Sequence, residues 1–437
     1  MNIAVAADGL RGHVDAVSSK SHVHRILICA ALADTPTTVT HVVMSRDIEA
    51  TIRCLSAGHL ASFAISGDTI LVVPARDFSR TEAVTLDCGE SGSTLRFMLP
   101  VAAACGLHAA FTGQGRLAQR PLTPLYELLV EKGVALSAQG SFPLFCRGQL
   151  RGGDYTIAGD VSSQFISGLL FALPLVREDS TITITQSLQS YDYIRMTLDA
   201  VKSFGIEIRQ TDKRHYVIPG GQTYRSPGTI RAEGDWSNAA FWLCAGALGE
   251  SDITVGNLNP DSLQGDKAVL SILKKFGASL SQPSESEVRV RASSLRGTVI
   301  NAEQIPDLVP VLAVCAAAAQ GETRICGAER LRLKESDRLM TVRELLEALG
   351  AAVTELPGEL LISGAGFDRT ATCRVNSHND HRIAMAAAVA APAVGRRIWI
   401  EDAGASAKSY PCFFEDFRSL GGEAKEVSDG IGIWEEH

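Results

Sequence analysis

Apolar and polar positions repeat regularly along the chain, and the pattern predicts two kinds of helix. In the first kind apolar side chains recur on one face, and a glycine follows within three residues. This spacing is typical of a surface helix, and glycine is favoured at a helix C-terminus because it accepts a left-handed backbone. The predicted copies are Thr51–Leu55, Leu125–Lys132, Leu198–Phe204, Val269–Phe276, Val342–Leu349 and Phe413–Leu420, followed by Gly58, Gly133, Gly205, Gly277, Gly350 and Gly421.

The second kind of helix is apolar on all sides and begins with polar residues. Phe241–Ala245 and Ile383–Val389 have no polar face, so they are predicted to lie in the centre of a core. Such helices begin near Ser19, Glu90, Ser162, Asp235, Asp307 and Asp380. Short strands with alternating or β-branched residues are predicted at Thr38–Thr40, Thr181–Thr185, Ile206–Ile208, Asp252–Val255, Ala278–Leu280 and Arg397–Ile400.

The two kinds of helix alternate, and the glycines recur about every 72 residues, which marks an internal repeat. The chain is therefore predicted to contain six copies of one unit built from helices and short strands. The predicted fold class is α/β, with α+β repeats in two domains of three units around buried helices. Tyr224–Gly228, between the third and fourth units, is predicted to be a linker.

Composition narrows the possible functions. The chain has 437 residues, 46% of them hydrophobic, and a formal net charge of −8, which argues against general binding of nucleic acid. The longest apolar runs fall short of the roughly 20 residues that a membrane helix needs, and no basic segment precedes an apolar one at the start. The ten cysteines show no Cys-x-x-Cys spacing. We expect a cytoplasmic protein without metal or cofactor, and a monomer.

The polar starts of the buried helices hold the candidate chemistry. A helix start offers unpaired N–H groups and the positive end of a dipole, so several starts in one cleft would attract anions. The lysines and arginines at these starts indicate a ligand with several negative groups. No phosphate-binding loop, dinucleotide fingerprint or serine-hydrolase elbow is present.

These motifs resemble the EPSP synthase family, the 3-phosphoshikimate 1-carboxyvinyltransferases, over essentially the whole chain. The resemblance rests on Ser19-Lys20-Ser21 with Arg25, Gly92, Arg120-Pro121, Ser162-Ser163-Gln164, Asp307, Lys334–Arg338, Asp380-His381-Arg382 and Lys408. It implies the enolpyruvyl transferase fold, with residues 1–18 and 231–437 in one domain and residues 19–230 in the other. The first domain would carry phosphoenolpyruvate-side cations and the catalytic carboxylates, and the second would bind phosphoshikimate.

The resemblance also implies a reaction and a set of site residues. The enolpyruvyl group of phosphoenolpyruvate would pass to the 5-hydroxyl of shikimate 3-phosphate, and phosphate would leave. The residues expected to bind shikimate 3-phosphate are Lys20, Ser21, Arg25, Ser162, Ser163, Gln164, Ser190, Tyr193, Asp307 and Lys334. Those expected to bind phosphoenolpyruvate are Lys20, Gly92, Arg120, Gln164, Arg338, Arg382 and Lys408.

Three residues are expected to be catalytic. Addition needs a base at the hydroxyl and an acid at the methylene carbon, and we assign Asp307 as the base and Glu335 as the acid. These roles could also be shared or reversed between steps. Glu335 stands among cations that favour its ionised form, so its acid role requires local desolvation or a second proton carrier such as Lys20.

Some positions depart from the commonest family pattern, and two other functions remain open. Glu90 stands where Asn is usual, Ser93 replaces a common Thr, and Arg330 stands where some members have Asn. One alternative is the related UDP-N-acetylglucosamine 1-carboxyvinyltransferase, whose members typically carry a reactive Cys in the region of Gly113–Arg120, where this chain has none. The other alternative is a non-catalytic repeat scaffold that binds an anionic partner.

Overall fold

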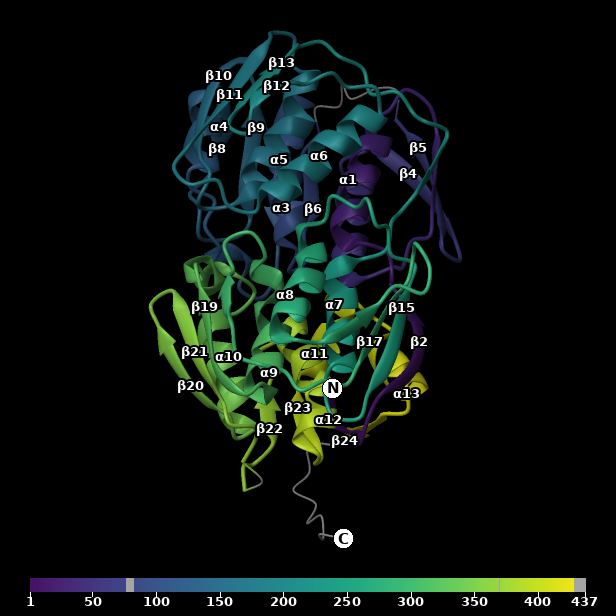
Figure 1. Cartoon of the computed structure of the whole chain (residues 1–437). Coiled ribbons are helices and arrows are strands. Elements are labelled where there is room, and N and C mark those ends of the chain that lie inside the picture. The colour runs from purple at the N-terminus through teal and green to yellow at the C-terminus, as the bar shows by residue number, and fades with distance from the viewer. Residues whose placement is uncertain (76–81, 369, 428–437) are drawn as a thin grey trace.

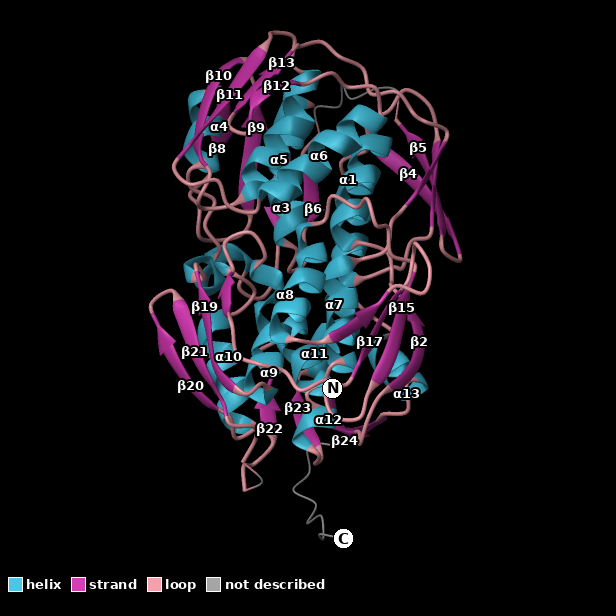
Figure 2. Cartoon of the chain, viewed as in Figure 1, coloured by secondary structure: helices cyan, strands magenta, loops and turns pink. Residues whose placement is uncertain are grey.

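The chain folds into two lobes in the computed structural model, which describes residues 1–75, 82–368 and 370–427. Helices gather in the middle of each lobe and sheets lie towards the outside (Figure 1, Figure 2). The buried apolar residues form two clusters. The core of the upper lobe in Figure 1 runs from Val23 to Ala232, and that of the lower lobe combines Ile3–Val17 with residues from Trp236 to Ala424.

The described residues form six four-stranded sheets of the same design, each with one parallel and two antiparallel pairings. The upper-lobe sheets are, in strand order, β14 (Thr229–Arg231), β3 (Thr37–Thr40), β5 (Thr69–Pro74) and β4 (Ala61–Ser66); β6 (Val84–Asp87), β7 (Ala109–Thr112), β9 (Leu144–Gly148) and β8 (Val134–Leu136); and β10 (Gly153–Ala158), β11 (Ser180–Thr185), β13 (His215–Ile218) and β12 (Arg209–Asp212).

The lower-lobe sheets are β16 (Ser279–Ser281), β17 (Val288–Arg291), β15 (Asp252–Gly256) and β2 (Arg11–Asp15); β18 (Val299–Asn301), β19 (Gly321–Cys326), β21 (Glu359–Gly364) and β20 (Ala352–Leu356); and β22 (Arg374–Asn376), β23 (Ile398–Glu401), β1 (Asn2–Ala6) and β24 (Glu423–Val427). Because β1 and β2 complete sheets formed mainly by the second half of the chain, the N-terminus belongs to the lower lobe. The common design of the sheets confirms the predicted sixfold repeat and the α/β fold class.

Both predicted kinds of helix are present. The buried helices are α1 (Lys20–Ala31), α3 (Gly92–Ala104), α5 (Ser163–Ala172), α7 (Trp236–Gly246), α9 (Val309–Ala318) and α11 (His381–Val389). The other long helices are α2 (Arg46–Ala57), α4 (Leu125–Glu131), α6 (Tyr191–Ser203), α8 (Val269–Phe276), α10 (Arg338–Ala348) and α13 (Phe413–Ser419). Shorter helical pieces are η1 (Leu117–Gln119), η2 (Leu173–Leu175), η3 (Gly265–Ala268), η4 (Pro306–Leu308), η5 (Glu329–Leu333), α12 (Ala391–Val394) and η6 (Ala403–Lys408).

One of the predicted glycine helix ends is wrong in detail. Gly133, Gly205, Gly277, Gly350 and Gly421 all have the left-handed backbone expected after a helix. Gly58 has a φ of −72°, and the next residue, His59, takes the left-handed conformation instead. Gly58 is needed for its size, because a β-carbon there would lie 3.1 Å from the Cys54 carbonyl oxygen and 3.3 Å from Leu107 Cδ1.

Two further local predictions are wrong. Ile206–Ile208 is not a strand, because Glu207 donates its N–H to Gln222 Oε1 and accepts from Gln222 Nε2 in place of strand partners. Tyr224–Gly228 is not a free linker. Tyr224 is fully buried in the upper lobe and its hydroxyl donates to the carbonyl of Phe171 at 2.8 Å.

The two passages of the chain between the lobes lie side by side. Ser18 and Gly234 form a β-bridge, and Asp235 donates its N–H to the Val17 carbonyl at 2.8 Å. These contacts fix the start of α1 beside the start of α7. No helix in the described ranges is long and apolar enough to cross a membrane.

Candidate active site

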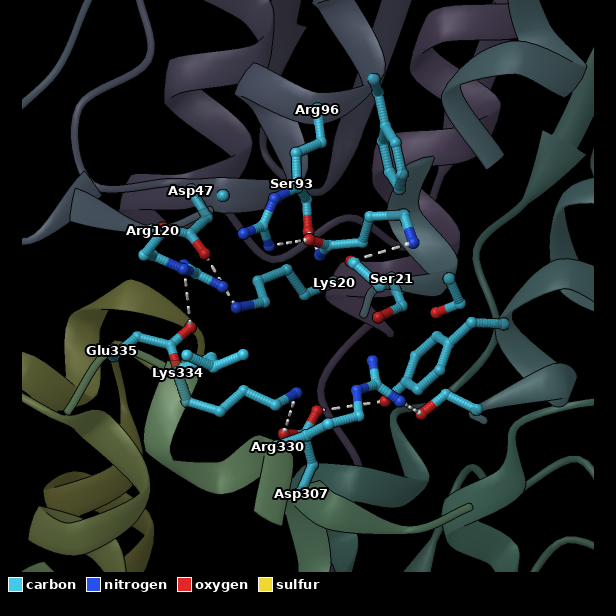
Figure 3. A pocket seen from close by; sticks show the side chains of 18 of the residues that line it. Lys20, Ser21, Asp47, Ser93, Arg96, Arg120, Asp307, Arg330, Lys334 and Glu335 are labelled. Atoms are coloured by element: carbon cyan, nitrogen blue, oxygen red, sulfur yellow. Dashed lines mark hydrogen bonds and ion pairs between the residues drawn. The ribbon is translucent and has the colours of Figure 1, made fainter. Parts of the chain in front are cut away.

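A pocket lies between the lobes, at the starts of the buried helices (Figure 3). Its upper wall is formed by Lys20, Ser21, Arg25, Asp47, Gly92, Ser93, Arg96, Phe97, Arg120, Pro121, Val161, Ser162, Ser163, Gln164, Ser190 and Tyr193. Its lower wall is formed by Asp307, Arg330, Leu333, Lys334, Glu335, Arg338, His381 and Arg382. Arginines and lysines outnumber the carboxylates Asp47, Asp307 and Glu335. This lining therefore suits anions. It brings together all the predicted site residues except Lys408.

The start of α1 is fixed from both lobes. Ser19 caps the helix, because its hydroxyl accepts the N–H of His22, and Asp235 of the lower lobe accepts the N–H of Lys20 at 3.1 Å. The Lys20 ammonium lies 2.8 Å from Asp47 Oδ2, which keeps it at the cleft wall. One turn later, Arg25 is buried and donates to Thr197 Oγ1 at 2.9 Å. Both cations are therefore held before any ligand binds.

The start of α5 gathers hydroxyl and amide groups. Ser162 caps this helix by accepting the N–H of Gln164. Gln164 accepts from Arg96 Nη1 at 2.7 Å and donates to Ser93 Oγ at 2.8 Å, so its amide orientation is set. From the lower lobe, Arg330 Nη1 donates to the Ser190 hydroxyl at 3.2 Å (Figure 3). A cation thus stands among hydroxyls, an arrangement that suits a phosphate.

Asp307 stands at the centre of the lower wall and is surrounded by cations. Its carboxylate lies 2.7 Å from Arg338 Nη1, 3.3 Å from Lys334 Nζ and 3.4 Å from Arg382 Nη2. Burial raises the pKa of this carboxyl, but the three cations outweigh burial and hold the pKa well below its usual range. The Tyr193 hydroxyl of the upper lobe also donates to Asp307, at 3.2 Å. Asp307 is therefore ionised and able to accept a proton.

Glu335 has a similar environment on the other side of Arg338. Its carboxylate lies 2.6 Å from Arg338 Nη2 and 3.7 Å from Arg120 Nη1 of the upper lobe. Burial raises the pKa of Glu335, but Arg338 and Arg120 dominate and keep it well below its usual range. The expectation that cations favour the ionised form of Glu335 agrees with this geometry.

Lys334 and Arg338 differ in how firmly they hold their protons. Burial lowers the pKa of Lys334 to about 8, against an opposing effect of Asp307. Arg338 is 1% exposed and lies 2.7 Å from Asp380, and its carboxylate partners raise its pKa. Lys334 therefore loses its charge as the pH rises through about 8, whereas Arg338 stays charged.

Lys408 does not belong to the described lining. Its ammonium lies 2.8 Å from Glu90 Oε2 and 2.6 Å from the Asn379 carbonyl oxygen. The structure thus places this cation against a carboxylate of the upper lobe.

Several residues of the lining were missing from the sequence-based set, among them Arg96 and Asp47, and so was Asp266, which lies beside Asp307. Arg96 had a usable signal, because it is a charged residue one helical turn after Gly92 in an otherwise apolar helix. Neither Asp47 nor Asp266 stands in a sequence motif that would mark it as a site residue. Asp266 is 2% exposed and accepts from Ser237. Burial and the neighbouring Asp307 raise its pKa to about 6.

Comparison with known proteins agrees with this site. The family described as EPSP synthase (3-phosphoshikimate 1-carboxyvinyltransferase) matches residues 6–417. The chain belongs to the EPSP synthase family. It is 42% identical to the 3-phosphoshikimate 1-carboxyvinyltransferase of Clostridium kluyveri over 429 residues, which cover 98% of this chain and 99% of the relative. The enzyme of the same name from Clostridium acetobutylicum is 42% identical over 96% of this chain and 97% of its own.

Solved structures of EPSP synthase and a related transferase share the fold. The EPSP synthase of Acinetobacter baumannii superposes with a TM-score of 0.79 at 24% sequence identity, covering 97% of this chain and 100% of that one. The enolpyruvyl transferase NikO of Streptomyces tendae gives a TM-score of 0.77 at 19% identity, over 97% and 98% of the two chains. The predicted enolpyruvyl transferase fold is confirmed.

Proposed function

We propose that this member of the EPSP synthase family transfers the enolpyruvyl group of phosphoenolpyruvate to the 5-hydroxyl of shikimate 3-phosphate and releases phosphate. The reaction belongs to the synthesis of aromatic amino acids through chorismate. The observation that carries the proposal is the Asp307 carboxylate, placed among Lys334, Arg338 and Arg382 in a pocket where the family's motifs meet. It offers a proton acceptor next to cations that suit two anionic substrates.

For shikimate 3-phosphate we propose the side of the pocket around α1, α5 and α6. The hydroxyls of Ser162, Ser163 and Ser190 suit the phosphate, and Lys334 of the lower wall would add a positive charge. The other residues proposed to contact this substrate are Lys20, Ser21, Arg25, Gln164, Tyr193 and Asp307. Because both lobes contribute, this substrate would join them.

For phosphoenolpyruvate we propose the side around the start of α3. Arg120, Arg338 and Arg382 supply guanidinium groups that match carboxylate and phosphate oxygens in pairs. Gly92 leaves room for the Arg120 guanidinium beside the helix start, where backbone N–H groups also suit an anion. Lys20 and Gln164 stand between the two substrates, and Lys408 would join from the lower lobe.

The proposed chemistry is addition followed by elimination. Asp307 accepts the proton of the 5-hydroxyl while the hydroxyl oxygen bonds to C2 of phosphoenolpyruvate. C3 of phosphoenolpyruvate receives a proton in the same step. The C2–O bond to phosphate then breaks, and C3 returns a proton to the protein. Glu335 is proposed as the group facing C3, but its lowered pKa makes it a better acceptor than donor. Lys20 is therefore proposed as the partner that supplies the proton.

We also propose a division into domains, a cellular location and an oligomeric state. Residues 1–18 and 231–437 would form one domain and residues 19–230 the other, except that Arg231, in β14, and Ala232 pack with the second of these domains. The protein would act as a cytoplasmic monomer, with two small anions as substrates and no cofactor.

Product identity tests the proposed function. The purified protein is incubated with shikimate 3-phosphate and phosphoenolpyruvate, and the products are separated and weighed by mass spectrometry. The expected product is the enolpyruvyl ether of shikimate 3-phosphate, formed only when both substrates are present. Asp307→Asn serves as the matched control that should form far less of it. No ether from the wild-type protein would reject the proposal.

A further inference from the structure

Glu90 links the two lobes at the edge of the pocket. It lies just before Ser91, the cap of α3 in the upper lobe. One of its oxygens lies 2.8 Å from the Lys408 ammonium, and both oxygens accept from Asn379 Nδ2, at 3.1 and 3.0 Å. Lys408 and Asn379 belong to the lower lobe, at the end of η6 and just before α11. A carboxylate of one lobe thus occupies a binding position for an anion on the other.

The contact with Glu90 makes the Lys408 ammonium less available to an anionic ligand. The Lys408 side chain is only 4% exposed, and the ammonium also donates to the Asn379 carbonyl at 2.6 Å. The arginines proposed to bind phosphoenolpyruvate, Arg120, Arg338 and Arg382, line the pocket, whereas the described lining does not include Lys408. In this arrangement the Lys408 ammonium is occupied by Glu90 and the Asn379 carbonyl.

We propose that Glu90 is an internal competitor of the second substrate: its carboxylate holds Lys408, and the phosphate or carboxylate of phosphoenolpyruvate must displace it. This inference rests on the proposed function for the identity of that substrate, but the competition itself concerns any phosphate-like anion. Glu90 is then a positioning residue, because it acts on the substrate through Lys408. It sets how strongly the enzyme binds its second anion.

Electrostatics gives the sign of the effect. When an anion binds at Lys408 while Glu90 stays nearby, two negative groups face one ammonium, and the repulsion weakens binding. Glu90 is 30% exposed, so solvent screens part of this repulsion. We therefore expect a moderate effect on affinity, about three- to fivefold, of the size that partly exposed charge pairs produce. The contrary role, in which Glu90 holds Lys408 ready for the substrate, predicts weaker binding when the charge is removed.

Glu90→Gln separates these two roles. Glutamine has nearly the same shape, and its amide oxygen can still accept from Asn379, but the negative charge is gone. At saturating shikimate 3-phosphate, we expect the KM for phosphoenolpyruvate to fall about three- to fivefold. We expect kcat and the KM for shikimate 3-phosphate to stay within about twofold. Glu127→Gln is the matched control, because Glu127 is an exposed carboxylate of the same lobe that accepts from Thr123 and Gln139.

Inorganic phosphate tests the competition without turnover. Its dissociation constant, measured by calorimetry with shikimate 3-phosphate present, should fall in Glu90→Gln by the same factor as the KM. Tighter phosphate binding supports the competition even in a protein that fails to transfer the enolpyruvyl group. An unchanged or raised dissociation constant in Glu90→Gln would overturn it, even in a protein with full transferase activity.

Repeating the comparison in a Lys408→Met variant shows whether Glu90 acts through Lys408. With Lys408→Met, the Glu90→Gln substitution should no longer change phosphate affinity, because the contested ammonium is absent. Thermal unfolding of each variant verifies that it is folded. Glu90→Ala repeats the comparison with the whole side chain removed. An equal gain in affinity with and without Lys408 would overturn the proposed route.

Discussion

Gly92 and Arg120 are in contact only because residue 92 has no side chain. A β-carbon at Gly92 would lie 2.5 Å from Arg120 Nη1 and 2.7 Å from its Cζ. The backbone at Gly92 is that of an ordinary helix start, so the requirement concerns space and not backbone conformation. Arg120 also reaches across the pocket to Glu335, at 3.7 Å. The glycine therefore sets where this guanidinium stands.

Gly92→Ala should weaken binding of phosphoenolpyruvate. The clashing atoms are the end of a flexible side chain, so Arg120 moves and the fold is kept. A displaced guanidinium loses paired contacts to the substrate, each worth about 1.5–3 kcal/mol as a charged hydrogen bond. We expect the KM for phosphoenolpyruvate to rise at least tenfold and the KM for shikimate 3-phosphate to change little, as measured by steady-state kinetics.

Gly404→Ala is the control for this substitution. A β-carbon at Gly404 would have its nearest contact at 3.5 Å, so alanine fits there. Both KM values should match the wild type. Equal KM values for phosphoenolpyruvate in Gly92→Ala and Gly404→Ala would show that Arg120 does not hold this substrate.

Asp307→Asn should remove the base and keep the binding site. Asparagine has the same shape, its one side-chain oxygen can still accept from Arg338, and its NH2 group can donate to the Tyr193 hydroxyl, but it cannot take the proton of the substrate hydroxyl. A general base contributes about a hundred- to ten-thousandfold to a rate, so kcat should fall by a factor in this range. Equilibrium titration with shikimate 3-phosphate should show affinity within a few-fold of the wild type. Lost binding together with preserved kcat would contradict the assigned role.

Lys334 should make binding of the first substrate depend on pH. Its pKa is lowered to about 8, so the ammonium is present below that pH and is lost as the pH rises through it. The ratio kcat/KM for shikimate 3-phosphate should therefore fall above about pH 8, since this ratio follows ionisation of the free enzyme. Lys334→Arg keeps its charge at these pH values, and its profile should stay flat to higher pH. The same fall of kcat/KM in both proteins would show that a group other than Lys334 is losing its proton.

Asp266 should make stability depend on pH in the opposite sense from a salt-bridged carboxylate. Its pKa is raised to about 6 in the folded protein, so folding favours the protonated form. That stability is present at low pH and is lost as the pH rises through about 6. When the pH is lowered from 7.5 to 5, the free energy of unfolding of the wild type should rise relative to that of Asp266→Asn. Urea denaturation at both pH values measures this difference. A constant difference between the two proteins would refute the raised pKa.

The fold could be predicted from sequence where local pattern decides it. Val269–Phe276 is predicted and observed with the same bounds, because its apolar spacing and Gly277 both lie within a few residues. The prediction fails where a distant residue intervenes. Gln222, 15 positions away, takes the backbone groups of Glu207. At Gly58 the difference is local, because the adjacent His59 takes the left-handed conformation instead.

The candidate site shows the same limit. Lys20, Ser162 and Asp307 could be predicted because they stand in motifs at helix starts. Asp47 could not, since its part in the pocket comes from a contact with Lys20, 27 positions away. The partnership of Glu90 with Lys408 spans 318 positions and has no local signal at all. The contact between Glu90 and Lys408 exists only once the two lobes are in place.

Release of inorganic phosphate from phosphoenolpyruvate tests the central claim most directly. The wild-type protein is assayed with phosphoenolpyruvate and either shikimate 3-phosphate, UDP-N-acetylglucosamine or no acceptor. Rapid release that depends on shikimate 3-phosphate, and little with the other two, is the predicted result. Release only with UDP-N-acetylglucosamine, or none with any acceptor, would contradict the proposed transferase function.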